Sequence, residues 1–525
     1  MTYNVPSIFN DVIGPLMRGP SSSHTAASVR IGKMVRQILN SKPVKMIVEF
    51  DINGSLATTH STQGSDFGLA AGLIGWDITH YGIQDSLTEA RKQGIDILFK
   101  TGDLNDPHPN TYNISITGEK GNKFFIQAVS VGGGSVEINR INELKVSLKG
   151  DSYETILFFN NRKKPELIAK IEVVKKILPE FEDISYDMQS DSGLISVKTL
   201  HKPDRKITTN IKQRTKAIYV CQIDPVMPVL YRKDIKVPFS GPKEMFKYNK
   251  TGKIDLYNLA LLYESQRGKI SEKEVFDSMK DLVVQLKRSV TEGLSGTAYQ
   301  NRILGPQAIK MEQADYDKKL IPLGITNKVI CYTIAMMDQK SSMGLIVAAP
   351  TAGSCGALPG AILGTAEDMG LKDSEITKAF LAAGLIGVFI AGESTFAAEE
   401  CGCQAECGSA SGMAAAGLVQ LMNGTADQAL AAASIALQNT MGMICDPVAR
   451  RVEVPCMGKN VMAAVNALSS ANMALAGVDF VIPLDEVIQA MDKAGRMLPY
   501  ELCCTGLGGL SITPTSKKIE NKLNK

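Results

Sequence analysis

The sequence predicts three consecutive parts: an α+β N-terminal domain, a small ferredoxin-like α/β module and an all-α helical C-terminal domain. Two observations support this prediction. Strand patterns between Gly-rich turns occur before about residue 225, whereas helical periodicity dominates from about residue 256 onward. The composition of the 525 residues, 44% hydrophobic and 21% charged, is that of a globular protein with about two to four domains.

The N-terminal domain is predicted to span residues 1–143. Within it, KMIVEFDI (45–52) and YNISIT (112–117) have the β-branched and aromatic residues of strands, and helical patterns alternate with them. The start of the chain has neither the basic region nor the apolar core of a secretory signal, so we expect a cytoplasmic protein.

The ferredoxin-like module is predicted over residues 150–225. It reads as a strand (ETILFFN), a helix (PELIAKIEVVKKIL), two strands (ISYDMQ and LISVKTL) and, after a short polar stretch, a last strand (AIYVCQI). Residues 226–255, which are rich in Lys, Gly and Pro, then read as a linker.

The helical domain is predicted over residues 256–515, followed by a charged, frayed tail at 516–525. Segments such as GMAAAGLVQLM and QALAAASIALQNTMGMI carry few charges on any face, so we expect these helices to be buried against one another. The longest apolar run, residues 379–392, is shorter than the about 20 residues of a membrane span and predicts a buried helix.

The charge pattern gives no sign of a nucleic-acid or membrane partner. The 57 basic and 54 acidic residues are interspersed and leave a formal net charge of +3, without an acidic or basic block. We therefore expect a small-molecule partner.

The 10 cysteines are concentrated in the last third of the chain. In a reducing cytosol such clustering indicates metal or redox chemistry before disulfides. Cys445 and Cys456 lie beside helix-breaking prolines, so we expect both thiols in loops at helix ends, within reach of a buried cluster. The spacing itself matches no common zinc or ferredoxin pattern. Spacing alone therefore favours metal binding and buried free thiols about equally.

A series of motifs runs in order along nearly the whole chain. They are GPSSSHTAASVRIG (19–32), NGSLATT (53–59), HPNT (108–111), SVGGG (130–134), AAPTAGSCGALPG (348–360), GCQAE (402–406), SGMAAAGL (411–418), CDPVARRVEVPC (445–456) and TGLGGLSITPT (505–515). Together they resemble segments of bacterial iron–sulfur L-serine dehydratases. In that family a β domain and an α domain occur on separate chains or fused, and this chain resembles the fused form with the β domain first.

The resemblance implies a four-iron, four-sulfur (4Fe-4S) cluster held by Cys403, Cys445 and Cys456, which match the family's GCQ, CDPV and VPC segments. Three protein thiolates leave one iron with an open position, which can bind the β-hydroxyl of L-serine and make it a better leaving group. A base removes the α-proton. Loss of water then gives aminoacrylate, which rearranges to an imine and hydrolyses to pyruvate and ammonium.

Four further cysteines are extra to the family pattern. Cys401 and Cys407 are expected to pack as small apolar residues. A sister group in the family ends in a cysteine that folds back onto the open iron. Because this chain ends in Lys525, we expect that plug to be missing, and Cys503 and Cys504 are the cysteines nearest to that end.

The substrate site implied by the resemblance draws on both domains. Its members are Ser21, Ser22, Ser23, His24, Thr25, Ser55, His108, Thr351, Gly353 and Ser354. Hydroxyls before a helical pattern suit a carboxylate, although taken alone they are more often a plain N-cap. The small-residue loop 351–356 offers backbone amides, although such a loop is more often only a tight turn. The chain departs from the family at 26–28, where AAS replaces AGP-like residues.

The family's usual catalytic histidine is missing from its expected place. Counting from Gly54 puts Gln63 there, and a Gln side chain cannot accept a proton at neutral pH. His60 is the nearest imidazole, and we predict that it is the catalytic base. The alternative is that His60 is a loop histidine within a hydrogen-bond network.

Residues 163–171 (KKPELIAKI) resemble the turn and helix of an ACT domain, the amino-acid-sensing fold, with Glu166 where glycine is usual. The missing glycine disfavours close approach of a ligand and leaves a dimerisation role, so we expect a homodimer. Two rival functions stay open. One is the same architecture acting on threonine or cysteine, and the other is an inactive amino-acid-sensing regulator.

Overall fold

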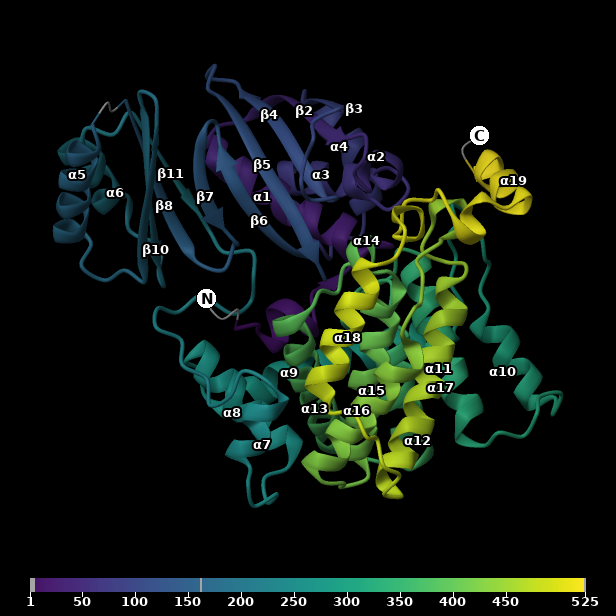
Figure 1. The fold of residues 1–525 in the computed structure, drawn as a ribbon. Coiled ribbons are helices and arrows are strands. Elements are labelled where there is room, and N and C mark those ends of the chain that lie inside the picture. Colours follow the sequence, from purple (N-terminus) through teal and green to yellow (C-terminus); the bar gives the residue numbers. More distant parts are fainter. Residues whose placement is uncertain (1–4, 161–162, 524–525) are drawn as a thin grey trace.

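The computed structural model describes residues 5–160 and 163–523. Figure 1 shows the helical part, teal to yellow, beneath two sheet-bearing parts in purple to blue. The α+β and helical parts predicted from the sequence are therefore confirmed. The candidate site lies where the N-terminal domain contacts the helical domain.

A six-stranded sheet forms the N-terminal domain, in the order β3-β2-β4-β5-β6-β7. β2 is parallel to β3, and all the remaining neighbouring pairs are antiparallel. The two strands predicted from the sequence are β2 and β4. The strands are β2 (Pro43–Asp51), β3 (Asp96–Gly102), β4 (Thr111–Gly118), β5 (Lys123–Gly132), β6 (Ser135–Ile141) and β7 (Leu144–Leu148).

Two helices of this domain are in close contact with each other. A Cβ atom on Gly72 of α3 would lie 2.1 Å from the carbonyl oxygen of Val29 in α1, so only glycine permits this contact. The π-helical turn η2 leads directly into α1. The bounds are η2 (Ser22–Ala26), α1 (Ala27–Leu39), α2 (Leu56–Thr59), α3 (Ser65–Ile74), η3 (Ile83–Asp85) and α4 (Ser86–Lys92).

The module has a four-stranded antiparallel sheet in the order β11-β8-β10-β9. With its two helices it follows the predicted ferredoxin-like βαββαβ order. The polar stretch before the last strand, to which no element was assigned from the sequence, forms helix α6. The elements are β8 (Tyr153–Asn160), α5 (Lys164–Ile177), β9 (Asp183–Gln189), β10 (Ser192–Thr199), α6 (Arg205–Thr215) and β11 (Tyr219–Ile223).

Helix α15 (Ser409–Leu421) is the centre of the helical domain. All of its residues are buried, and it packs against α12, α13, α16 and α17, as all-round apolar helices must. The other helices are α8 (Leu256–Gly268), α9 (Glu272–Leu294), α10 (Ala308–Tyr316), α11 (Ile325–Ser341), α12 (Ala357–Asp368), α13 (Asp373–Glu393), α14 (Ala398–Cys401), η4 (Gln404–Gly408), α16 (Ala426–Thr440), η5 (Val448–Arg450), α17 (Cys456–Leu475), α18 (Leu484–Arg496), η6 (Tyr500–Leu502) and η7 (Gly509–Ile512).

Helix α13 contains the apolar run predicted to be a buried helix. It is long and apolar enough to cross a membrane, but 78% of its most apolar window is buried within the structure. The N-terminal turn η1 (Ile8–Val12) packs against α13, and Ile8 and Val12 lie over its glycines 384 and 387. The helix is therefore a core element, as predicted.

In and around the helical domain the structure has three features that the sequence did not predict. The linker 226–255 contains a helix, α7 (Pro242–Tyr248), and the expected frayed tail forms α19 (Pro514–Leu523) up to the last two residues, 524–525, which lie outside the described residues. Ser516 of α19 is buried and accepts a hydrogen bond from the Ala449 amide. The all-α domain also carries one short strand, β12 (Ile346–Val347), which pairs with β1 (Leu16–Met17) of the N-terminal part.

Candidate active site

A small buried cavity lies where the N-terminal domain meets the helical domain. Its volume is about 10 Å³, close to that of one water molecule. Side chains from both domains line it, so segments that are far apart in the sequence meet here. The lining residues are Ser21, Ser23, Gln63, Gly353, Ala398, Glu399, Glu406, Cys445, Pro447, Val452, Cys456 and Cys504.

The SSSHT segment forms the N-terminal wall of the cavity. Ser21 caps η2 and accepts a hydrogen bond from the His24 amide, so the predicted N-cap is present. Ser23 Oγ donates to Glu399 Oε1 over 2.8 Å and thereby joins the two domains. Thr25 Oγ1 donates to the Gln63 carbonyl, which holds the loop that carries Gln63 against η2.

His24 is fully buried, and its partners define its tautomer. Thr59 Oγ1 donates to the Ser55 carbonyl, so it accepts from His24 Nε2, 2.8 Å away. Nδ1 is then the acceptor for the Ser21 hydroxyl, 3.1 Å away, because the Ser23 hydrogen goes to Glu399. Burial, helped by the charge of His60, lowers the pKa of His24 to about 3. His24 is therefore neutral at physiological pH.

The loop 351–356 lies opposite this wall. The Ala352 amide donates to Ser22 Oγ over 3.2 Å, and Thr351 Oγ1 donates to Glu406 Oε1 over 2.6 Å. Gly353 lines the cavity, whereas Thr351 and Ser354 lie behind it, hydrogen-bonded to each other. Each side chain predicted in this loop is thus at the cavity or one contact away from it.

The three predicted ligand cysteines gather at the other end of the cavity. Cys445 and Cys456 line it, and the buried Cys403 is hydrogen-bonded to Cys407, with 3.8 Å between the two sulfur atoms, and to Cys445. Each stands at a helix or turn boundary: Cys403 precedes η4, Cys445 precedes η5 and Cys456 begins α17. The sequence predicted this placement for Cys445 and Cys456.

Charges around the thiols favour a thiolate at Cys403. Hydrogen bonds from Cys407 and Cys445 lower the pKa of Cys403 well below its ordinary value. Burial alone would lower the pKa of Lys459, but the charge of Cys403 and a 2.8 Å bond to Asp446 raise it. Lys340 is fully buried and donates to the Val452 carbonyl. Two ammonium groups therefore stand near the cysteines.

No group of three or more His, Cys, Asp or Glu side chains is arranged to hold a single metal ion within residues 5–160 and 163–523. Ligands of an iron–sulfur cluster each bind a different iron, so they need not converge on one point. The described cysteines are therefore not arranged as a zinc-type site.

The cysteines outside the family pattern occupy two kinds of place. Cys407 packs against Cys403, and Cys504 lines the cavity with its thiol 3.5 Å from Gln63 Nε2. Cys503 is buried and its backbone bridges to Cys445, while Cys401 faces Asp492 of α18. Cys504 is thus the extra cysteine that lines the cavity together with Cys445 and Cys456.

His60, the predicted base, is not among the residues that line the cavity. Its Nδ1 lies 2.5 Å from Asp66 Oδ1, and its ring packs against Phe50 and Phe99. Gln63, at the usual histidine position, does line the cavity. His60 is therefore hydrogen-bonded to Asp66 outside the cavity, whereas Gln63 lies at the cavity.

The two remaining predicted residues support the site from outside. Ser55 is buried, and its hydroxyl donates to the Cys504 carbonyl over 3.3 Å. His108 Nε2 lies 3.7 Å from Glu400 Oε1 of α14, and the Pro109 carbonyl accepts from the Ser55 amide. The contacts with Cys504 and Glu400 join the N-terminal domain to the helical domain, and the bond to Pro109 lies within the N-terminal domain.

Sequence reasoning missed three polar residues of the site: the buried Glu399 and Asn460, and the partly buried Glu406. Burial, with the charges of Cys403 and Glu399, raises the pKa of Glu406 to about 8. Asn460 donates to the Gly353 carbonyl and accepts from the Gly356 amide, which fixes the loop. Acidic residues beside Cys403 in an otherwise small and apolar segment were the signal that could have revealed both glutamates.

The fold and this two-domain site define a family. The profile described as "Serine dehydratase alpha chain" matches residues 206–511, and that described as "Serine dehydratase beta chain" matches residues 12–93. The chain belongs to the serine dehydratase family and carries both parts in one polypeptide.

Individual relatives agree with this assignment. The chain is 35% identical over 285 residues to a probable L-serine dehydratase alpha chain of Bacillus subtilis, covering 54% of this chain and 95% of the relative. It is 38% identical over 170 residues to the probable beta chain of the same organism, covering 32% and 75%. L-serine dehydratase 1 of Escherichia coli is 30% identical over 291 residues, covering 53% and 62%.

Proposed function

We propose that this protein is an L-serine dehydratase, a lyase that converts L-serine to pyruvate and ammonia. The observation that carries the proposal is that one buried cavity is lined both by the SSSHT wall and by the cysteine group. Relatives named L-serine dehydratase match both the part that supplies the hydroxyls and the part that supplies the thiols.

The donor set suits a four-iron, four-sulfur cluster held by Cys403, Cys445 and Cys456. The thiols are buried together beside Lys340 and Lys459, whose charges offset those of thiolates. The cavity is smaller than such a cluster, so its side chains must move apart on binding. When bound, a cluster with three protein ligands supplies an open iron that polarises the departing hydroxyl.

The chain's own groups then bind and orient the amino acid. We assign the substrate carboxylate to the hydroxyls of Ser21 and Ser23 and to the backbone amides around Gly353, because these line one cavity and donate hydrogen bonds. Glu399 lines the same cavity and suits the substrate ammonium group. Neutral His24 positions Ser21 without adding charge.

We keep His60 as the proposed base. Asp66 accepts from Nδ1, which leaves Nε2 unprotonated and able to take the α-proton, the role a carboxylate plays for a catalytic histidine. His60 lies outside the cavity lining, so the 60–63 loop must bring it inward when substrate binds. Glu406, already at the cavity, is the competing proton acceptor.

Pyruvate formation from L-serine by anaerobically reconstituted protein tests the proposal. Threonine and cysteine are assayed beside serine, because Gln63 and the neighbouring Cys504 depart from the family pattern and bear on substrate choice. Turnover should need iron, decay in air within minutes to hours and recover with iron and thiol. Activity that is unaffected by air and depends on pyridoxal phosphate would contradict the proposed mechanism. Absence of turnover with all three amino acids would favour the inactive regulator.

We further propose a cytoplasmic homodimer in which the ACT-like module serves association. Supporting this are the ferredoxin-like topology of the module and Glu166 at the position where a ligand-binding glycine is usual. Light scattering of the full chain and of a variant with a charge introduced on the exposed side of β9 would test it.

A further inference from the structure

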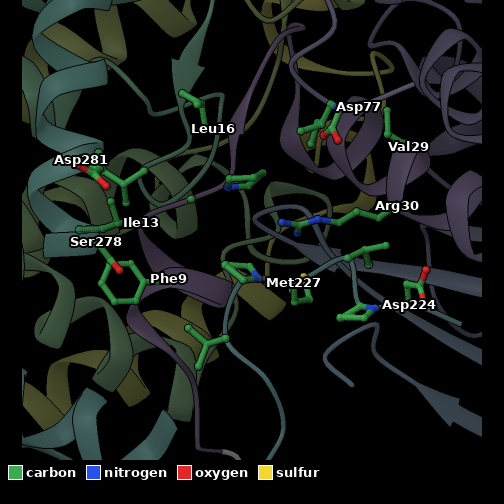
Figure 2. Close-up of a pocket in the computed structure, with 18 of the residues that line it drawn as sticks. Phe9, Ile13, Leu16, Val29, Arg30, Asp77, Asp224, Met227, Ser278 and Asp281 are labelled. Carbon is green, nitrogen blue, oxygen red and sulfur yellow. The ribbon is translucent and has the colours of Figure 1, made fainter. Parts of the chain in front are cut away.

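A second, much larger cleft lies away from the candidate active site. It has a volume of about 1000 Å³ and is formed by α1, α9 and the segment 224–229 that follows the module. None of the residues that line the active-site cavity lines this cleft. Figure 2 shows Arg30 reaching in from one side and Asp281 and Ser278 from the other. A cleft of this size can hold a small organic molecule.

The side chain of Arg30 indicates which kind of ligand the cleft binds. It is only 5% exposed, yet it makes no ion pair among the described residues. Its Nη1 donates to the Gly134 carbonyl over 2.6 Å, and within residues 5–160 and 163–523 its Nε and Nη2 have no hydrogen-bond partner. Burial lowers the pKa of Arg30 to about 10, against the charges of Asp11 and Asp77, so it stays cationic at neutral pH. A buried guanidinium with free donors suits a carboxylate.

The opposite wall carries negative charge. Glu274, Asp277 and Asp281 lie on one face of α9, and Asp281 has no polar partner in the described part of the chain. Five carboxylates line the cleft, and three of them pair with lysines: Asp77, Asp224 and Asp277. Glu274 and Asp281 have no salt bridge among the described residues, which disfavours a multiply charged anion such as phosphate beside α9. Ile13 and Leu16 also line the cleft and offer an apolar surface.

We propose that this cleft binds an elongated zwitterion, with a carboxylate on Arg30, an apolar stem over Ile13 and Leu16, and an ammonium group on the acidic face of α9. A basic amino acid or an ω-amino carboxylate has this shape. The site is independent of the proposed serine chemistry, because it shares no residue with the cavity where that reaction is placed.

Calorimetric titration of the full-length protein with 6-aminohexanoate tests the site. Hexanoate and hexylammonium serve as matched probes, since each keeps the stem and one of the two charges, and inorganic phosphate tests a simple anion site. We expect saturable binding of 6-aminohexanoate that is tighter than that of every other probe. No saturable binding, equal affinity for hexanoate, or tighter binding of phosphate would each overturn the proposal.

Variants of Arg30 and Asp281 then test which side chain binds the carboxylate end and which binds the ammonium end of the ligand. Arg30→Met should weaken binding of 6-aminohexanoate at least about tenfold, because a charge-assisted hydrogen bond is lost. Asp281→Asn should weaken it about two- to fivefold, as expected for an exposed ion pair. Asp281 is exposed, so this variant keeps the test valid if Arg30→Met does not fold. Glu272→Gln, on the same helix but outside the cleft, is the matched control and should bind like the wild type. Unchanged binding in both Asp281→Asn and a folded Arg30→Met contradicts the assignment.

Discussion

Ser23 of the N-terminal domain donates a 2.8 Å hydrogen bond to the buried carboxylate of Glu399 in the helical domain. The two residues are 376 positions apart in the sequence. Because both line the cavity, this bond joins the two walls between which the substrate is proposed to bind.

Removing that hydroxyl should therefore impair catalysis. Ser23→Ala leaves the Glu399 carboxylate without its nearest donor, and losing a hydrogen bond to a charged group costs about 1.5 to 3 kcal/mol. We expect kcat/KM for L-serine to fall about 10- to 100-fold while the iron content stays unchanged. Ser28→Ala, which removes a buried hydroxyl bonded to the Thr25 carbonyl outside the cavity, is the control. Equal losses in both variants would mean a general packing defect.

Each proposed cluster ligand should be essential for iron binding. Replacing Cys403, Cys445 or Cys456 with Ser, one at a time, should remove the iron, the labile sulfide and the brown colour, because a hydroxyl is a poor ligand for this soft site. Cys331→Ser is the control, since this thiol is half-buried beside α10, far from the cysteine group in the sequence. Single variants that retain full iron content would disprove the ligand assignment.

The identity of the base can be separated from cluster binding. Loss of a general base typically costs about 100- to 10,000-fold in rate. His60→Ala should lower turnover by that amount with the cluster absorbance retained, Asp66→Asn should lower it less, and Gln63→Ala should cost much less than His60→Ala. If His60→Ala works at nearly the wild-type rate while Glu406→Gln is inactive with its cluster intact, the proton acceptor is the glutamate at the cavity.

Acid should destabilise the protein partly through His24. Its folded-state pKa of about 3 lies below the ordinary value of 6.5. Between these values only the unfolded chain takes up the proton, so this contribution to stability is present above pH 6.5 and is lost as pH falls toward 3. One such group contributes a slope of up to about 1.4 kcal/mol per pH unit.

Denaturant unfolding of the apoprotein at pH 7, 6 and 5 measures this slope. His24→Gln should be less stable at pH 7 but should lose less stability on acidification than the wild type. His201→Gln, at an exposed position, should follow the wild-type curve. A wild-type slope that is unchanged in His24→Gln would show that other groups account for the acid sensitivity.

The sequence predicted the elements whose patterns are local. The segment 112–117 of strand β4 alternates apolar and polar residues, helix α15 is an uncharged run of small and apolar residues, and helix-breaking prolines placed Cys445 and Cys456 at helix ends. Helix α6 was missed because only three of its residues are buried, which leaves a weak apolar stripe in a polar segment. Helix α19 was taken for a tail for the same reason, since only Ser516 is buried there.

By itself, then, the sequence determined the three-part organisation, the family resemblance and the residue types available for chemistry. Only the tertiary structure decided that Ser23 meets Glu399, that Cys504 stands beside Gln63, and that His60 pairs with Asp66 outside the cavity. The tertiary structure also decided that Arg30 is buried without an ion pair among the described residues. The physical reason is that periodicity follows from backbone geometry over a few residues, whereas these contacts join segments far apart in the chain. They depend on how whole domains bury their surfaces against each other.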